Sequence, residues 1–248
     1  LGAHVLIAVA LVIAWKVTSE PDLPDSLLCS SRKGPLAHTI LLVDKTDPLT
    51  FTQGKAFKQI LEDFSKGKYA KEGELLSVFV LGEDFRDTAD PIFEKCNPGD
   101  GSSRNRVTEN PELWKRKHQT EFVAPLLSLE DRMRSLQPAK RSPILEMMQV
   151  VSLRFAKYGA RGARKLFVVS DMLHNTAELS FFHAPPDFEK VSKQPAFARL
   201  RSKLDSVDVT VFLLLHNPQL QTRRLSTFWE DYFKDMGGSV QKFDPLPG

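Results

Sequence analysis

Cysteine is scarce in this sequence, which holds only Cys29 and Cys96 among its 248 residues. Neither has a CxxC partner or a nearby histidine, so a zinc site is not expected. Both lie in polar segments that contain proline or glycine, whereas buried free thiols usually lie in apolar runs. We therefore predict a Cys29–Cys96 disulfide and an oxidising compartment. Two free surface thiols are the alternative.

An excess of charge of one sign is also lacking. The 34 Lys and Arg residues against 31 Asp and Glu leave a formal net charge of only +3. No basic block interleaved with aromatic residues stands out, so no nucleic-acid partner is expected. P-loop, GxSxG and HExxH motifs are absent from the sequence as well, which argues against the enzyme classes that depend on them.

One long apolar run is present, residues 5–15 (VLIAVALVIAW), directly before Lys16. A membrane span needs about 20 apolar residues, so we interpret residues 1–16 as the remnant of a transmembrane anchor with Trp15 and Lys16 at the interface. A signal-peptide core is the alternative, but it should end in a small-x-small cleavage site rather than Ala14-Trp15-Lys16. Together with the disulfide, the anchor predicts a single-pass bacterial protein whose soluble domain is extracytoplasmic, in the periplasm.

The remainder is expected to form a linker and one soluble domain. Residues 17–35 contain three prolines with Ser, Asp and Gly, a composition typical of a linker. The domain is expected over residues 36–248, because 42% hydrophobic and 26% charged residues are ordinary for a globular chain with one substantial core.

Short aliphatic runs alternate with amphipathic segments along this domain. Strands are predicted at 38–44, 75–82, 164–171, 207–215 and 239–243. Helices are predicted from Thr50 or Thr52 to Gly67, over 111–136, over 143–158 with Ser142 as cap, up to about 204, and over 220–236. Residues 83–110 read as a long loop. The alternation predicts an α/β fold, a doubly wound, mostly parallel sheet flanked by helices in a three-layer sandwich.

Oxygen-bearing side chains follow several of these strands. In open α/β sheets, ligands bind where the loops converge at the carboxyl ends of the strands. Carboxylates and hydroxyls are hard ligands suited to Mg²⁺, which needs only one or two protein carboxylates. The residues expected at this edge are Asp44, Thr46, Asp47, Thr50, Ser142, Ser170 and Asp171.

The order of elements and the DKTDPLT segment resemble the von Willebrand factor A family over residues 36–244. That family builds a metal-ion-dependent adhesion site from a DxSxS motif, a Thr of a second loop and an Asp of a third. The resemblance implies metal ligation by Asp44, Thr46, Ser142 and Asp171.

The motif is incomplete in this chain. Pro48 stands at the third position of DxSxS and has no ligating side chain. Thr50 or Asp47 would have to substitute there. Without a metal, Asp44 and Asp171 would cap helices or accept backbone N–H groups in their own turns.

Other loop residues give weaker indications. A base from His174 or His183 would reach the site, yet histidines in polar loops are more often solvated than catalytic. His216 reads as a strand-end residue. The aromatic segment around Phe181, Phe182 and Phe188 reads as packing over the sheet edge or, alternatively, as an apolar lid for a partner.

The leading hypothesis from the sequence is a membrane-tethered binding, adhesion or scaffolding module that engages a protein partner in a membrane-associated complex, with Mg²⁺ as candidate cofactor. A hydrolase of the phosphatase type is one alternative, because an Asp after the first strand is the nucleophile in haloacid dehalogenase-type enzymes. Those enzymes need a second acid where this chain has Thr46. A degenerate structural subunit of an envelope assembly is the other alternative.

Overall fold

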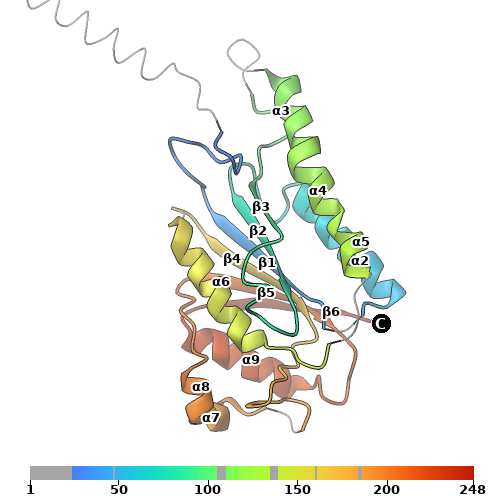
Figure 1. Ribbon diagram of the computed structural model, residues 1–248, viewed down its shortest axis with the longest axis vertical. Helices are drawn as coiled ribbons and strands as arrows, with labels where there is room; N and C mark the ends of the chain where they lie inside the picture. Colours follow the sequence, from blue (N-terminus) through green and yellow to red (C-terminus); the bar gives the residue numbers. More distant parts are fainter. Residues whose placement is uncertain (1–23, 47, 105–109, 135–138, 160, 184–185) are drawn as a thin grey trace, which may run out of the picture.

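A computed structural model describes residues 24–46, 48–104, 110–134, 139–159, 161–183 and 186–248. A six-stranded sheet with the order β3-β2-β1-β4-β5-β6 forms its centre (Figure 1). The strands are β1 (His38–Asp44), β2 (Leu75–Leu81), β3 (Phe93–Cys96), β4 (Arg164–Ser170), β5 (Val207–Leu214) and β6 (Ser239–Leu246). Every pair of neighbours is parallel except β2 and β3. The predicted fold class is confirmed.

Helices cover both faces of the sheet (Figure 1). One face carries α2 (Phe51–Ser65), α3 (Pro111–Lys117), a π-helical segment (His118–Val123), α4 (Ala124–Leu127) and α5 (Leu129–Arg134). The other carries α6 (Ile144–Tyr158), α7 (Phe188–Val191), α8 (Pro195–Ala198) and α9 (Arg223–Asp235). The molecule is thus a three-layer sandwich.

The two cores explain why the central strands are aliphatic throughout. Along β1, Ile40 and Leu42 pack toward α6 and α9, whereas Leu41 and Val43 pack toward α2. All seven residues of β1 are buried. A parallel strand covered on both faces has no solvent side, so its sequence is a continuous apolar run rather than an alternating one.

Caps set the ends of the helices beside the carboxyl edge. Thr50 caps α2 by accepting from the Gln53 N–H, and the Gln53 side chain accepts in return from the Thr50 N–H. Gly67, the residue predicted to end the helix, has a φ of +77° and follows the C-cap residue Lys66. The expected cap of α6 is wrong, because Pro143 occupies the N-cap position and the Ser142 side chain points elsewhere.

Two predicted segments differ from the structure. The expected loop 83–110 contains β3, which pairs antiparallel with β2 at the edge of the sheet. The expected single helix ending near residue 204 is instead α7 and α8, because Pro195 lacks the N–H that a continuing helix requires and begins α8.

The disulfide is confirmed: Cys29 and Cys96 are bonded, with their Cα atoms 5.0 Å apart. Both side chains are buried against Leu75. The Cys96 N–H also donates to the carbonyl of Leu27 at 2.7 Å. The described part of the expected linker therefore lies along the sheet edge formed by β3.

The expected anchor, residues 1–16, lies outside the described residues. From residue 24 onward, wherever the chain is described, none of the helices combines the length and apolar character that crossing a bilayer requires.

Candidate functional site

Asp44 is the last residue of β1 and the centre of the strand-end cluster. Its Oδ1 accepts two hydrogen bonds from Thr46, one from the backbone N–H at 2.9 Å and one from the hydroxyl at 2.7 Å. These contacts bend the chain sharply where the strand ends. The turn places the Thr46 hydroxyl beside the carboxylate, and the bond from the Thr46 N–H is the contact expected of Asp44 without a metal.

Two other loops supply the remaining donors. Oδ2 of Asp44 accepts from the Ser142 hydroxyl at 3.1 Å and from the Ser170 hydroxyl at 2.8 Å. Ser142 precedes α6 and Ser170 ends β4, so residues separated by 98 and 126 positions from Asp44 meet at one carboxylate. The structure therefore brings together Asp44, Thr46 and Ser142 of the expected set and adds Ser170.

Asp171 follows Ser170 and is itself buried, with 4% of its surface exposed. Its Oδ1 accepts from the Leu173 N–H at 2.9 Å, a contact within its own turn. Its carbonyl accepts from the Gln221 side chain at 3.0 Å. Asp171 thus lies beside the cluster and braces the loop after β4 against the segment that leads to α9.

The proposed substitutes for the missing third ligand do not improve the motif. The Thr50 hydroxyl accepts from the Gln53 N–H as the cap of α2, and Thr50 is exposed. Pro48 is exposed as well, and Asp47 lies outside the described residues.

Burial controls the electrostatics of this site. Removal from water raises the pKa of Asp44 above its usual range, and hydrogen bonds from Thr46, Ser170 and Ser142 offset that rise only in part. Asp44, Thr46 and Ser142 are each between 3% and 5% exposed. The carboxyl group of Asp44 is therefore held in a closed, hydroxyl-lined position.

The donor chemistry fits a hard cation. Each hydroxyl has a single proton and donates it to Asp44, which leaves oxygen lone pairs for a further partner, although the Ser170 oxygen already accepts from the Met172 N–H at 2.8 Å. Mg²⁺ prefers such oxygens and keeps several waters of its own. Among the described residues, no three or more His, Cys, Asp or Glu side chains group together so that they could hold a metal ion. A cation at this edge would depend on the hydroxyls and on the two carboxylates Asp44 and Asp171.

His174 differs from its predicted place in solvent, because it is fully buried. Its Nδ1 accepts from the Leu145 N–H at 3.4 Å, and burial lowers its pKa to about 3. A neutral, enclosed imidazole positions the start of α6 rather than acting as a solvent-exposed base. His183 is exposed, and His216 contacts Gln53 at 2.9 Å beside the end of β5.

The aromatic segment after β4 is mainly packing. Phe181 is 1% exposed and lies edge-on to Phe228 of α9, with 4.7 Å between ring centroids. Phe188 packs against the same ring. Phe182 alone of the three is exposed, at 43%.

A second carboxylate, which no motif of the sequence indicates, is largely buried toward the opposite edge of the sheet, with 10% of its side chain exposed. Glu94 of β3 accepts two hydrogen bonds from the Arg154 guanidinium, at 2.8 and 2.6 Å, and a third from the Tyr158 hydroxyl at 2.6 Å. Arg154 and Tyr158 are four residues apart on α6 and share one helix face. That spacing was the available signal, but nothing in the sequence paired it with a glutamate 60 residues away.

The network extends into the strands. Ser77 of β2 donates to Glu94 at 2.7 Å, and His38 of β1 lies 2.9 Å from the Ser77 hydroxyl. Burial would raise the pKa of Glu94, but the hydrogen bonds from Arg154, Tyr158 and Ser77 outweigh it and hold the pKa below its usual range. Burial lowers the pKa of His38 to about 4, so this histidine is neutral at neutral pH.

Comparison with known proteins gives a general likeness only. No protein-family model matches the chain, and no curated protein matches it. Among solved structures, a von Willebrand factor type A protein from Catenulispora acidiphila is similar with a TM-score of 0.43 and 10% identity. The match covers 85% of this chain but only 39% of that one.

Two Bacteroides proteins are similar over most of both chains. An aerotolerance-related membrane protein from Bacteroides fragilis has a TM-score of 0.40 and 10% identity, over 84% of this chain and 92% of that one. BatB, a conserved hypothetical protein from Bacteroides thetaiotaomicron, has a TM-score of 0.37 and 14% identity, over 84% and 91%. The α/β sandwich itself is established by the strand order and pairing of this chain.

Proposed function

We propose that this chain is a membrane-tethered module that binds a protein partner through the loops at the carboxyl edge of its sheet. A Mg²⁺ ion held by Asp44, Thr46, Ser142 and Asp171 takes part in the contact, with Ser170 as an additional hydroxyl. The tether is the apolar run 5–15. The domain thereby presents its loops to a partner in a membrane-associated complex.

One observation carries the proposal: three loops deliver three hydroxyls to a single buried carboxylate. A buried charge is unfavourable unless an opposite charge or a full set of hydrogen bonds compensates it. The groups that lower the pKa of Asp44 are three hydroxyls and one backbone N–H. They do not bring this pKa back to its usual value. A cation at the hydroxyl oxygens supplies the missing compensation.

The same arrangement indicates the chemistry of the partner. Asp44 and Asp171 supply at most two negative charges to a bound Mg²⁺, and the neutral hydroxyls add none, so the ion keeps water in its remaining positions. An Asp or Glu side chain of a partner protein is suited to replace one of these waters. The loop edge would then recognise an exposed acidic residue.

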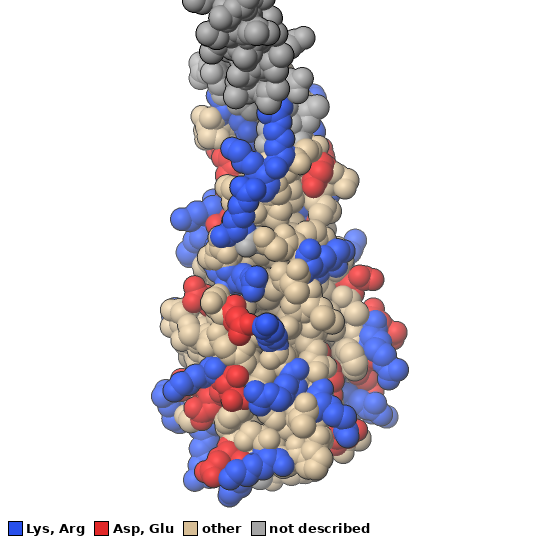
Figure 2. All heavy atoms as spheres, turned by 90° about the vertical axis from the view of Figure 1, so that its left-hand side faces the viewer, with Lys and Arg blue, Asp and Glu red and all other residues tan. Residues whose placement is uncertain are grey.

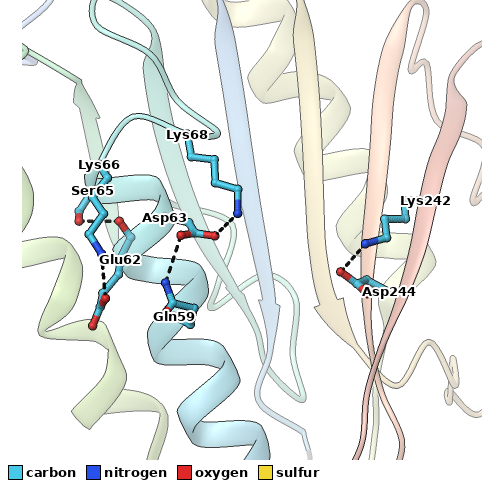
Figure 3. A network of polar contacts seen from close by, with 8 residues as sticks. All are labelled: Gln59, Glu62, Asp63, Ser65, Lys66, Lys68, Lys242 and Asp244. Atoms are coloured by element: carbon cyan, nitrogen blue, oxygen red, sulfur yellow. Dashed lines mark hydrogen bonds and ion pairs between the residues drawn. The ribbon is translucent and has the colours of Figure 1, made fainter.

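Calorimetric titration of the full chain in detergent with Mg²⁺ and Mn²⁺ tests the metal. We expect saturable binding that Asp44→Asn abolishes. The matched control is Asp244→Asn, which makes the same chemical change at an exposed carboxylate paired with Lys242 on β6 (Figure 3). Binding that is absent from the wild type, or that Asp44→Asn leaves unchanged, contradicts the metal-dependent form.

A structural subunit without metal is the second candidate, and one observation favours it. Both oxygens of Asp44 already accept two hydrogen bonds each, and the residues around it are almost fully enclosed. Asp44 then acts only as a clamp that joins β1, β4 and the loop before α6. Copurification from membranes separates the candidates, because a clamp predicts partner capture that persists when Mg²⁺ is removed by a chelator.

A further inference from the structure

The end of the molecule at Pro24 lies away from the strand-end site and has a surface of its own. Pro24 bridges to Ser30 there, and the disulfide ties this segment to β3. Figure 1 shows the start of α3 and the C-terminal end of α6 at the same end of the sheet. The carboxyl-edge loops with Asp44 lie at the other end of the strands.

Basic side chains gather on this end. Arg32, Lys33, Lys157 and Arg161 are exposed. Backbone contacts hold their segments together: the His38 N–H donates to the Ala163 carbonyl at 3.1 Å, which joins the turn after α6 to the start of β1. Figure 2 shows a run of Lys and Arg side chains down the upper part of the described surface, with acidic groups mostly farther along.

Residues 24–36 and 157–164 contain five Lys or Arg residues and a single acid, Asp25. Glu94 is already paired with Arg154, with an N–O distance of 2.6 Å. Asp25 directs its carboxylate to the backbone N–H groups of Leu27 and Cys29, at 2.8 and 2.9 Å. The end face therefore carries net positive charge, although the whole chain is close to neutral.

Apolar and aromatic groups accompany the charge. A hollow of about 400 Å³ is lined by, among others, Lys33, Leu36, Arg104 and Trp114. Leu36 is 51% exposed, and the Trp114 ring lies 4.1 Å beneath the Arg104 guanidinium, which Glu72 also pairs. Basic groups mixed with an exposed leucine and an indole are the composition that the headgroup region of a bilayer accommodates.

The short linker before Pro24 keeps this end of the molecule close to the headgroup region. Only residues 16–23 separate the apolar run from Pro24. Eight residues span at most about 30 Å when fully extended. If residues 5–15 lie in a bilayer, the end with Pro24 stays within that distance of the headgroups, whereas the carboxyl-edge loops point away.

From this juxtaposition we infer that the end face built from residues 24–36, 157–159 and 161–164 and the hollow beside Trp114 docks on anionic lipid headgroups. Docking orients the domain upright, so that the Asp44 edge faces a partner. The inference rests on the proposed membrane tether and adds a defined orientation to it. It does not depend on metal binding.

Quenching of Trp114 in nanodiscs tests the docking. The full chain is prepared with Trp15→Phe, so that Trp114 reports on the surface while Trp229 stays fully buried. Discs contain a spin-labelled headgroup lipid in either phosphatidylcholine alone or a mixture with phosphatidylglycerol. We expect stronger quenching in the anionic discs, reversed by about 0.5 M NaCl, because salt screens the attraction.

Charge removal gives the decisive comparison. Each basic residue near an anionic surface shifts docking about fivefold, so Lys33→Gln with Arg161→Gln lowers the ratio of docked to undocked domain roughly 30-fold. The matched control is Lys55→Gln with Lys140→Gln, two exposed lysines next to the carboxyl edge, which leaves quenching unchanged.

The outcomes are distinguishable. A chain that does not coelute with discs refutes the tether and the docking that rests on it. A chain that coelutes but shows equal quenching in neutral and anionic discs overturns the docking alone. If the double variant leaves quenching unchanged but weakens capture of a protein partner, the end face binds protein and the lipid inference is wrong.

Discussion

Two carboxylates, Asp44, which is buried, and Glu94, which is largely buried, lie toward opposite edges of one sheet and have different surroundings. Glu94 has a guanidinium bound by two hydrogen bonds and a depressed pKa. Asp44 has hydroxyl and backbone donors and a raised pKa. Each accepts four hydrogen bonds from the protein, so the number of donors does not explain the difference.

The difference is the presence of a cation. At Glu94 the chain supplies its own, Arg154, and the site is complete without any further group. At Asp44 the same chain uses neutral hydroxyls, and of their oxygens only that of Ser170 is described as accepting a further hydrogen bond, from the Met172 N–H. We interpret the Glu94 cluster as structural and the Asp44 cluster as prepared for a positive group from outside.

Breaking the disulfide is expected to change the free energy of unfolding most. It loosens the part of the sheet that contains Glu94 and not the part that contains Asp44. Cys29 and Cys96 close a loop with a sequence separation of 67. Replacing both by serine is expected to lower the free energy of unfolding by about 4 kcal/mol on loop-closure grounds. Urea unfolding of both proteins measures it. A reductant should destabilise the wild type equally and leave the double variant unchanged.

Removing the internal cation is the next largest change. Arg154→Met leaves Glu94, whose side chain is 10% exposed, without a compensating charge. We expect a loss of about 3 kcal/mol in unfolding free energy, the usual consequence of orphaning a buried ion. Adding Glu94→Gln should restore part of it. A loss below about 1 kcal/mol would show that the two carboxylates do not differ in the way described.

The sequence predicted the sheet better than the clusters, for a physical reason. Strands β1, β2, β4 and β5 are short apolar runs that can only be buried, so their pattern suffices. Strand β3 is four residues with two polar ones, and its place depends on pairing with β2 and on the disulfide. Such a segment has no local signature.

In the candidate site too, local contacts could be predicted from the sequence and contacts between distant residues could not. That Asp44 accepts a backbone N–H in its own turn was one of the alternatives drawn from the sequence, since such a contact lies within one local segment. Ser142 was expected at the site but also as a helix cap, and only its contact with Asp44 decides that the hydroxyl faces the carboxylate. Ser170 donates to Asp44, whereas the Asp171 carboxylate accepts within its own turn. This depends on the direction in which each side chain points at the end of β4, which the spacing alone does not determine.

Neutralising Asp44 should have a smaller effect with a characteristic pH dependence. Asp44→Asn removes a buried charge while Ser142 and Ser170 can turn to accept from the new amide, so we expect a change within about 1 kcal/mol without Mg²⁺. The folded pKa of Asp44 is raised by burial. The contribution of Asp44 to the unfolding free energy is therefore present at low pH and is lost as the pH rises through the folded pKa. Acidification from neutral pH should hence stabilise the wild type relative to this variant.

Glu94 gives the opposite sign and serves as the control for that measurement. Its folded pKa is lowered, with hydrogen bonds from Arg154, Tyr158 and Ser77 overcoming burial. Its contribution is present above the unfolded pKa and is lost as pH falls through the folded one. The advantage of the wild type over Glu94→Gln should hence shrink on acidification. Unfolding curves at several pH values that show the same sign for both carboxylates would contradict the comparison.

The smallest effect is expected at an ion pair on the surface. Lys66 and Glu62 of α2 are four residues apart, with an N–O distance of 3.1 Å and side chains 65% and 32% exposed (Figure 3). Water already solvates both charges, so Lys66→Gln should change the unfolding free energy by less than about 0.5 kcal/mol. High salt should reduce even that difference, whereas the loss in Arg154→Met should persist because its pair is shielded from ions. Equal salt sensitivity of the two variants would mean that Glu94 is not protected from solvent, and the contrast with Asp44 would lose its basis.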